Sequence, residues 1–204
     1  MNFQSEKQIV RDFYADLDGA AGGDIAAAMA RHCHPDLLWR GYHPFGEIRG
    51  AEQVAHRFWQ PLRENLTRMQ RRVDVFFAGA NRFDDPGGVW VCSMGHLMGL
   101  HDGPWLGIRP TGKMAFLRYC AFHKVQDGKI TETAMYFDIP QLMMQAGLRP
   151  FPVQSAAQLV QPGPLTHDGL LYDAQAKEEG AKTLATIEAM ISDMGQWQND
   201  LPLE

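Results

Sequence analysis

The sequence predicts an α+β fold, in which a curved antiparallel sheet wraps around N-terminal helices into a cone and an extra C-terminal helix follows. Three observations support this prediction. Apolar residues recur at helical spacing in the first part of the chain. Strand-like segments then follow one another without an intervening helix, and the last two flank a tight turn. A cone of this kind leaves an apolar pocket, the usual location of a small-molecule site.

The first two predicted helices lie at the start of the chain. One begins at Ser5 and ends at Gly19, with apolar residues at the spacing that places them on one face. The other runs over residues 25–31 and has Asp24 as its N-cap. We expect both helices to cover the same face of the sheet.

The third predicted helix follows Gly50 and contains Pro61. Because proline has no N–H to donate, Pro61 must break or kink the helical hydrogen-bond ladder. The remaining segments of this region are a strand over residues 37–42, a loop over 43–50, and strands over 73–80, 89–100 and 114–125.

A hairpin closes the sheet. Asp127-Gly128 is a dipeptide that tolerates positive φ at both central positions of a type I′ turn. A two-residue turn pairs Val125 with Ile130, His123 with Glu132, Ala121 with Ala134, Tyr119 with Tyr136 and Leu117 with Asp138. Because side chains alternate along a strand, these residues share one face, and Arg118, Cys120, Met135 and Phe137 lie on the other. A single bulge would exchange the faces beyond it.

Asp138 is the main catalytic candidate, and it has a structural alternative. It directly precedes a short helix over residues 139–146, Pro140 suits the first turn of that helix, and Gln141 completes a capping-box pattern. A cap of this kind contributes about 1 kcal/mol to stability. If its oxygens also face the cone, Asp138 could both cap the helix and transfer protons.

His123 is the second catalytic candidate. The predicted register places it opposite Glu132, and a carboxylate beside an imidazole can tune the basicity of the imidazole towards neutral pH. Both residues lie close to the turn, so a surface ion pair at the solvated rim is the alternative interpretation.

Aromatic residues suggest how a flat, partly hydroxylated ligand could be bound, although core packing is the simpler explanation for most of them. The substrate-binding candidates are Tyr119, Tyr136, His43, Trp39, Trp59 and Arg118. Tyr119 and Tyr136 stand out because the predicted register gives them the face of Asp138. Arg118 would hold an oxyanion only if a bulge turned it inward.

Composition excludes several function classes. With a net charge of −5 and no sustained basic run, nucleic-acid binding is not expected. The three scattered cysteines indicate reduced thiols in a cytoplasmic protein, and no apolar segment is long enough to span a membrane.

The His32-Cys33-His34 run lacks a second ligand cluster, so we expect no metal. The glycine-rich segment 99–112 has neither phosphate-loop nor dinucleotide spacing, so we expect no cofactor.

The C-terminal segment differs from the rest. Residues 161–169 are typical of an extended linker, and residues 173–197 of a helix. The helix has a narrow apolar seam formed by Leu184, Ile187, Ile191 and Met194. We expect this seam to be covered either by a second subunit in a homodimer or by a further domain.

The sequence resembles the SnoaL-like polyketide cyclase family of the nuclear-transport-factor-2-like superfamily. The matching features are the initial helix, His34-Pro35-Asp36, the Gly107-Ile108-Arg109-Pro110-Thr111-Gly112-Lys113 loop, Asp127-Gly128-Lys129-Ile130, and Asp138 followed by Leu142, Gln145 and Gly147. The resemblance covers roughly residues 5–150. We therefore place the SnoaL-like domain at residues 1–150 and the linker with the C-terminal helix at 151–204.

The resemblance implies a cofactor-independent cyclase that closes a ring by intramolecular aldol condensation, with an acidic residue and a histidine in the cone. Carried over from the hairpin turn, the acid's position holds Met135 and the histidine's position holds Ala121, and neither can transfer a proton. We therefore expect a pocket for a small polyketide-like ligand, with cyclisation or isomerisation as one function. The alternative is a non-enzymatic ligand-binding or assembly domain of the same superfamily.

Overall fold

A computed structural model of the chain describes residues 3–21, 24–81, 88–153, 164 and 166–196. These residues belong to two compact units, Met1–Tyr172 and Asp173–Glu204, and each is described by itself. The first unit contains the whole sheet and all helices except the last one.

The first unit confirms the predicted α+β fold. Its strands form a six-stranded sheet in the order β2-β1-β6-β5-β4-β3. Neighbouring strands are antiparallel except β1 and β6, which run parallel and were not expected to pair. The strands are β1 (Cys33–Gly41), β2 (Glu47–Arg49), β3 (Leu66–Ala80), β4 (Val89–His101), β5 (Met114–Gln126) and β6 (Lys129–Phe137).

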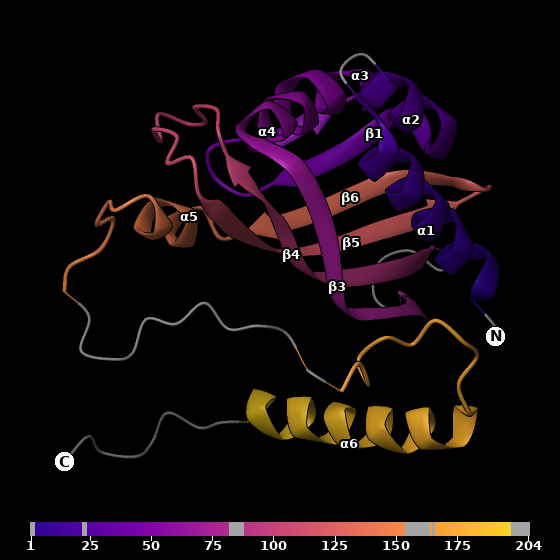
Figure 1. The fold of residues 1–204 in the computed structure, drawn as a ribbon. Coiled ribbons are helices and arrows are strands. Elements are labelled where there is room, and N and C mark those ends of the chain that lie inside the picture. The colour runs from indigo at the N-terminus through magenta and orange to yellow at the C-terminus, as the bar shows by residue number, and fades with distance from the viewer. Residues whose placement is uncertain (1–2, 22–23, 82–87, 154–163, 165, 197–204) are drawn as a thin grey trace. The chain divides into compact units, whose positions relative to one another are not determined.

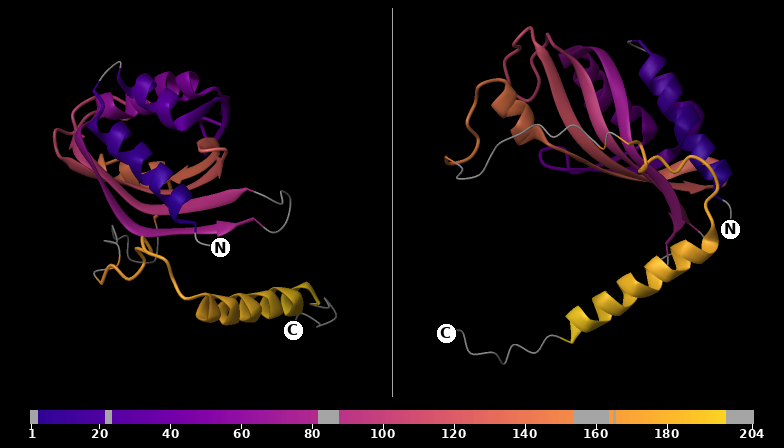
Figure 2. Two further views of the ribbon diagram at one scale, coloured as in Figure 1. Left: turned by 90° about the vertical axis from the view of Figure 1, so that its right-hand side faces the viewer. Right: turned by 60° about the horizontal axis from the view of Figure 1, so that its bottom comes forward.

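The N-terminal helices lie on one face of this curved sheet (Figures 1 and 2), and α5 lies at one end of it. We call the face towards the N-terminal helices the inner face and the opposite one the outer face. The helices of this unit are α1 (Gln4–Gly19), α2 (Asp24–His32), α3 (Ala51–Val54), the π-helical segment η1 (Ala55–Trp59), α4 (Gln60–Asn65) and α5 (Ile139–Gln145).

The predicted first helix matches α1 closely. It buries Val10, Phe13, Tyr14 and Leu17, which recur at helical spacing and face the sheet. α1 packs across β3, β4, β5 and β6, so its residues enter the cone beside the strands that form the walls.

Pro61 interrupts the third helix as predicted. The backbone stays helical through this point, but the hydrogen-bond pattern becomes π-helical in η1, which ends two residues before Pro61. The interrupted helix still buries Phe58, Trp59 and Leu62, so the break does not remove this segment from the core.

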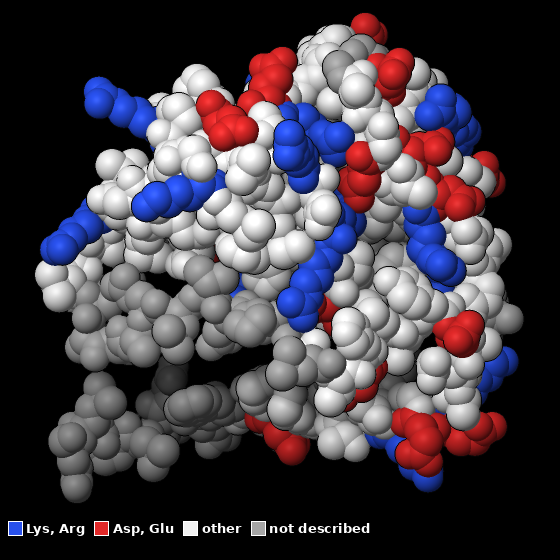
Figure 3. All heavy atoms as spheres, viewed as in Figure 1, with Lys and Arg blue, Asp and Glu red and all other residues white. Residues whose placement is uncertain are grey.

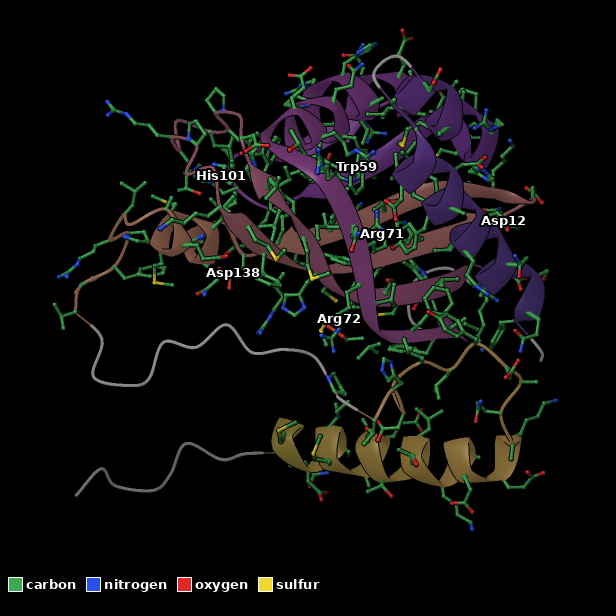
Figure 4. All side chains as sticks on the ribbon, in the orientation of Figure 1. Asp12, Trp59, Arg71, Arg72, His101 and Asp138 are labelled. Atoms are coloured by element: carbon green, nitrogen blue, oxygen red, sulfur yellow. The ribbon has the colours of Figure 1, made fainter. Side chains whose placement is uncertain are left out.

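β3 is longer than expected, because it begins at Leu66 and includes the basic residues 68–72. Two irregularities accompany this extension, between Thr67 and Gln70 and between Val73 and Val75. Asp74 has no partner opposite it at the second irregularity, which is how a β-bulge re-aims a side chain. Figure 4 shows the neighbours Arg71 and Arg72 on opposite faces of this strand.

The hairpin turn was predicted correctly, but the register beyond it was not. Asp127 and Gly128 have φ values of 50° and 75°, and Val125 pairs with Ile130. Beyond this pair Lys124 faces Glu132, so Thr131 is an extra residue in β6. The resulting pairs are Lys124 with Glu132, His123 with Thr133, Ala121 with Met135 and Tyr119 with Phe137.

This bulge exchanges the two faces of β6. Thr133, Met135 and Phe137 point into the cone with Tyr119 and His123, and all five are buried. Glu132, Ala134 and Tyr136 turn to the outer face, where Arg118 and Cys120 also lie. The predicted grouping of Tyr119, Tyr136 and Asp138 on one face is therefore wrong.

A short edge segment extends the first unit beyond the predicted domain end at residue 150. Phe76 N–H donates to Gly169 O at 2.8 Å, and Leu171 N–H donates to Phe76 O at 2.8 Å. The Tyr172 ring packs on Phe76, and the Arg11 guanidinium lies 4.7 Å above that ring. Residues 161–163 and 165 of the predicted linker 161–169 lie outside the described residues.

The second unit contains α6 (Lys177–Gly195), where the sequence predicts a helix; Trp197 lies outside the described residues. None of its described side chains is buried, and the seam residues Leu184, Ile187, Ile191 and Met194 are 42–58% exposed. Among the described residues, no helix is long and apolar enough to cross a membrane.

Candidate functional site

Polar side chains from five elements meet inside the cone. We call this set the cone cluster. It consists of Tyr14 and Asp18 from α1, Arg71 from β3, Ser93 from β4, Tyr119 and His123 from β5, and Thr133 from β6. Figure 4 shows Arg71 between the sheet and the helices, below Trp59. Buried polar groups of this number must satisfy one another or meet a ligand.

His123 lies at the centre of the cone cluster. Its Nε2 is 2.7 Å from Tyr14 Oη, and its Nδ1 is 2.9 Å from Thr133 Oγ1. Burial, followed by the charge of Arg71, lowers the pKa of His123 to about 3. The imidazole is therefore neutral at pH 7, with one ring nitrogen donating a hydrogen bond and the other accepting one.

Arg71 brings a positive charge into the cone. Its Nε and Nη2 donate to the two carboxylate oxygens of Asp18 at 2.8 and 2.9 Å. Burial alone would lower the pKa of Arg71, but the charge of Asp18 and the nearby Tyr119 and Tyr14 hold it above its usual value. The guanidinium stays charged with its side chain only 4% exposed.

The two tyrosines of the cone cluster surround this guanidinium. The Arg71 guanidinium carbon lies 4.0 Å above the Tyr14 ring and 5.2 Å from the Tyr119 ring centre. Ser93 Oγ is 2.9 Å from Tyr119 Oη. Burial and then Tyr119 raise the pKa of Tyr14 despite the charge of Arg71, so Tyr14 is a proton donor rather than a phenolate.

Aromatic residues close the cone beyond the cluster. Trp39 packs on Phe58 with ring centres 4.7 Å apart, and Trp59 packs on the same ring at 4.9 Å. Trp105, which follows β4, also packs near Phe137, with ring centres 6.4 Å apart. The binding candidates Trp39 and Trp59 thus lie inside the cone as core residues, 1% and 3% exposed.

The predicted dyad of His123 and Glu132 does not form. The bulge at Thr131 places Glu132 on the outer face, where it pairs with Arg40. His123 remains on the inner face, 2% exposed, rather than at a solvated rim. The one-residue shift therefore gives His123 a hydroxyl partner on β6 in place of a carboxylate.

Asp138 caps α5, which was the structural alternative for this residue. The Gln141 N–H donates to Asp138 Oδ1 at 2.9 Å, and Asp138 N–H donates to Arg118 O at 3.0 Å. Its carboxylate lies on the outer side of the sheet, away from the cone cluster (Figure 4). Of the two predicted catalytic residues, only His123 is in the cone.

The other predicted site residues divide between two places. A hollow of about 410 Å³ on the outer face, which we call the outer hollow, is lined by Arg118, Tyr136 and Asp138 together with Cys120 and Met94. The Tyr119 hydroxyl points into the cone instead, 2.9 Å from Ser93 Oγ. The sequence thus predicted residues that the fold does bring together, but on the wrong side of the sheet. His43 is exposed in the loop after β1 and joins neither place.

Two further hollows accompany the outer one. A hollow of about 420 Å³ is formed by consecutive residues of segment 144–153 and has Arg149 as its charged side chain. A smaller one of about 230 Å³ lies between the end of α1 and α4, where Arg63 donates to Asp18 O at 3.1 Å. The smaller hollow is therefore linked to Asp18 of the cone cluster only through the backbone contact of Arg63.

The structure places the His32-Cys33-His34 run in divergent positions. His32 hydrogen-bonds to Asp16 at 2.8 Å, Cys33 is buried, and His34 is exposed. Across the described part of the chain, no group of three or more His, Cys, Asp or Glu side chains could hold a metal ion.

Comparison with known proteins identifies the family. A family model for the SnoaL-like domain matches residues 10–133, which is more than half of the chain. The chain belongs to the SnoaL-like family. A comparison with curated proteins found no match.

Solved structures similar to this SnoaL-like domain share its fold. A candidate SnoaL-like polyketide cyclase from Jannaschia sp. CCS1 is 22% identical, with a TM-score of 0.53 over 74% of this chain and 95% of that one. A candidate polyketide cyclase from Xanthomonas campestris is 22% identical, with a TM-score of 0.53 over 70% and 97%. AclR, a candidate hydroxylase from Streptomyces galilaeus, is 17% identical, with a TM-score of 0.54 over 73% and 99%. Since these names give different activities, the fold does not decide the chemistry.

The register relates the cone cluster to the positions that the resemblance marks for catalysis. Ala121 and Met135 pair directly across β5 and β6 and both face the cone of this SnoaL-like domain. The next inner pair towards the turn is His123 with Thr133. Polar groups are therefore present on the same two strands, one inner-facing pair away from the expected positions.

Sequence reasoning missed most of the cone cluster. Tyr14 lies among the regularly spaced residues of the first predicted helix, and Arg71 precedes the strand predicted at residues 73–80. A signal was present, because β3 extends through residues 68–72 and strand alternation turns every second side chain of that run inward. Ser93 and Thr133 are small polar residues in apolar strands and carried no signal of their own.

Proposed function

We propose that this SnoaL-like domain binds a small, mainly apolar carbonyl compound in the cone and catalyses cofactor-independent acid/base chemistry on it. The reaction class is enolisation that leads to intramolecular aldol cyclisation or to isomerisation. The observation that carries the proposal is the fully buried chain of hydrogen bonds from Tyr14 through His123 to Thr133.

The hydrogen-bond chain supports proton transfer in both directions. Tyr14 Oη–H is a donor suited to a carbonyl oxygen, and neutral His123 can accept a proton from it or directly from carbon. An enolate that forms beside His123 would raise the pKa of its imidazolium and so favour the transfer. Arg71 would stabilise the negative charge of the enolate in a site that excludes water.

Access to the cone is proposed at Asp18. Its side chain is 24% exposed while that of its partner Arg71 is 4% exposed, so the ion pair runs from solvent into the interior. Arg63, which lines the hollow of about 230 Å³, donates to the backbone oxygen of Asp18 at 3.1 Å. A ligand that enters here meets Arg71 and Tyr14 before it reaches the aromatic end of the cone.

Proton exchange tests the proposal without knowledge of the natural substrate. The α-protons of 1-tetralone, an apolar aromatic ketone, would be followed by NMR in D₂O with and without the protein. We expect exchange above the buffer rate, and a loss of about 100-fold in His123→Ala or Tyr14→Phe, the range of general acid/base effects. His34→Ala is the matched control, because His34 is exposed on the outside of the domain.

A second candidate function is ligand binding or assembly without catalysis. The observation that favours it is the apolar pair Ala121 and Met135 at the positions where the resemblance implies a histidine and an acid. In this case the wild-type protein would bind 1-tetralone without accelerating its exchange.

We also propose that a second copy of the chain, or a further domain, covers the exposed seam of α6. Its four seam residues are apolar, and none is buried. Sedimentation of the full chain and of residues 1–172, a compact unit by itself, tests this. Equal association states and equal solubility of the two proteins would contradict a covered seam.

We also propose a cytoplasmic location, which the free cysteines support.

A further inference from the structure

Two thiols lie side by side on the outer face, away from the cone cluster. Cys120 on β5 pairs with Met94 on β4, and Cys92 is two residues from Met94 on the same strand. The two cysteines are therefore diagonal neighbours across the strands, and their thiols hydrogen-bond to each other. Cys92 is 5% exposed, whereas Cys120 is half-buried and lines the outer hollow.

We propose that Cys120 is a nucleophilic thiol that adds to small conjugated carbonyl compounds entering the outer hollow. The walls of the hollow include Met94, Tyr136 and Pro140, so an apolar carbon electrophile fits them better than a charged one. Tyr42 and Tyr136, with ring centres 6.1 Å apart and ring planes tilted by 48°, provide aromatic surface at its rim.

Cys92 supplies the group that makes Cys120 reactive. The Cys92 thiol is buried beside Cys120 and can donate its S–H to the Cys120 thiolate. This hydrogen bond lowers the pKa of Cys120, although burial opposes the effect. Cys33 shows the contrast, because burial without such a donor raises its pKa to about 12.

Arg118 supplies a positive charge on the same side of the sheet. It lies two residues before Cys120 on β5, faces the same way and lines the outer hollow. Its Nε donates to His96 Nε2 at 3.5 Å, and His96 Nδ1 donates to Asp74 Oδ2 at 3.1 Å. The bulge in β3 that re-aims Asp74 thus helps to hold Arg118 beside the hollow.

The proposed addition balances without an oxidant or a reductant. The Cys120 thiol loses its proton to water, and the thiolate sulfur forms a bond to the β-carbon of the conjugated carbonyl compound. The π electrons of the carbon–carbon double bond move to the carbonyl oxygen, where Arg118 can stabilise the enolate. Water then protonates the α-carbon, which leaves a saturated thioether.

Alkylation of the full chain by methyl vinyl ketone tests this proposal. Peptide mass spectrometry would give the rate at each cysteine between pH 6 and 9. We expect Cys120 to react at least 10-fold faster at pH 7 than Cys33 or Cys92, with its rate rising at a lower pH than theirs. The titratable and charged groups around Cys120 are Cys92 on β4, Arg118 on β5, Tyr136 on β6, and Tyr42 and Asp138 at the rim of the hollow; His96 lies behind Arg118.

Two substitutions of Cys92 test whether its S–H group makes Cys120 reactive. Cys92→Ala removes the S–H donor, so the rate at Cys120 at pH 7 should fall about 10-fold, as expected for a thiol returning to a pKa near 8.5. Cys92→Ser keeps a hydroxyl donor and should retain most of the rate.

Three results would overturn the proposal. The first is protection of Cys120 in the native chain until urea is added. The second is an equal rate at Cys120 and Cys33. The third is an unchanged rate in Cys92→Ala. Alkylation at Cys120 does not involve the cone, so it can succeed or fail independently of α-proton exchange.

Discussion

Tyr14 and His123 are 109 residues apart in the chain, and the Tyr14 Oη lies 2.7 Å from His123 Nε2. Their rings are also in edge contact, with centroids 5.5 Å apart. The contact joins α1 to β5 and depends on two local features. The apolar spacing of α1 turns Tyr14 towards the sheet, and the alternation of β5 turns His123 towards the helix. Both groups are therefore buried together at the centre of the cone cluster.

Tyr14→Phe should lower the free energy of unfolding by about 1–3 kcal/mol, because it leaves His123 Nε2 buried without its hydroxyl partner. Urea denaturation followed by circular dichroism would measure the change. Tyr42→Phe is the matched control, since Tyr42 is 59% exposed, and it should change stability by less than about 0.5 kcal/mol. Equal effects of the two substitutions would show that the Tyr14 hydroxyl has no buried partner.

The pKa of His123 predicts how stability depends on pH. An unfolded histidine titrates near 6.5, whereas the folded pKa is lowered to about 3. Between these values the unfolded chain binds more protons, so the stability from His123 is present above pH 6.5 and is lost as the pH falls towards 3. Between pH 6.5 and 3, the loss in the free energy of unfolding approaches about 1.4 kcal/mol per pH unit.

His123→Gln isolates this contribution from those of other groups. The wild type and the variant would be unfolded with urea at pH 5, 6 and 7, and the stability difference between them should shrink on acidification. A difference that stays constant over this range would mean that His123 titrates normally in the folded protein.

Asp138→Ala should remove the cap of α5 and lower the free energy of unfolding by about 1 kcal/mol. Asp138→Ser keeps an oxygen that can accept a hydrogen bond from Gln141 N–H, so it should lose less stability than Asp138→Ala. Because Asp138 lies on the outer side of the sheet, the exchange of 1-tetralone protons should be the same in both variants. Loss of exchange in a well-folded Asp138→Ala protein would restore Asp138 as the catalytic candidate.

Gly95→Ala should destabilise the protein by more than about 1 kcal/mol, because there is no space for a methyl group beside the bulge in β3. A Cβ at Gly95 would lie 2.0 Å from the carbonyl oxygen of Arg72, which is backbone and cannot rotate away. Gly79→Ala is the control, since nothing lies within 4 Å of its Cβ position. Thermal unfolding of the two variants compares them, and equal midpoints would contradict this close approach.

The sequence predicted the elements of the fold well, because they depend on local patterns. The α1 stripe, the break at Pro61, the turn at Asp127-Gly128 and the cap at Asp138 each follow from neighbouring residues. The pairing of β1 with β6 was missed, since it joins strands far apart in the chain. The short strand β2 was also missed, because three residues give too little alternation to detect.

The site was predicted less well, and a single residue explains most of the error. Thr131 adds a bulge that no turn motif announces, and it exchanges the faces of every later residue in β6. His123 was named as a candidate and does lie in the cone, but with hydroxyl partners. Arg71 and Asp18 form an ion pair across 53 residues, which only the tertiary structure reveals.

The most direct test of the cone cluster is the NMR titration of the His123 imidazole nitrogens, with and without 1-tetralone. We expect His123 to stay neutral from pH 8 to below pH 5, with one protonated nitrogen, and its nitrogen chemical shifts to change when 1-tetralone binds. The nitrogen signals of His34, which is exposed on the outside of the domain, should not change when the ketone is added. A His123 imidazole that takes up its second proton near pH 6.5, or whose signals do not respond to a bound ketone, would contradict a functional site in the cone.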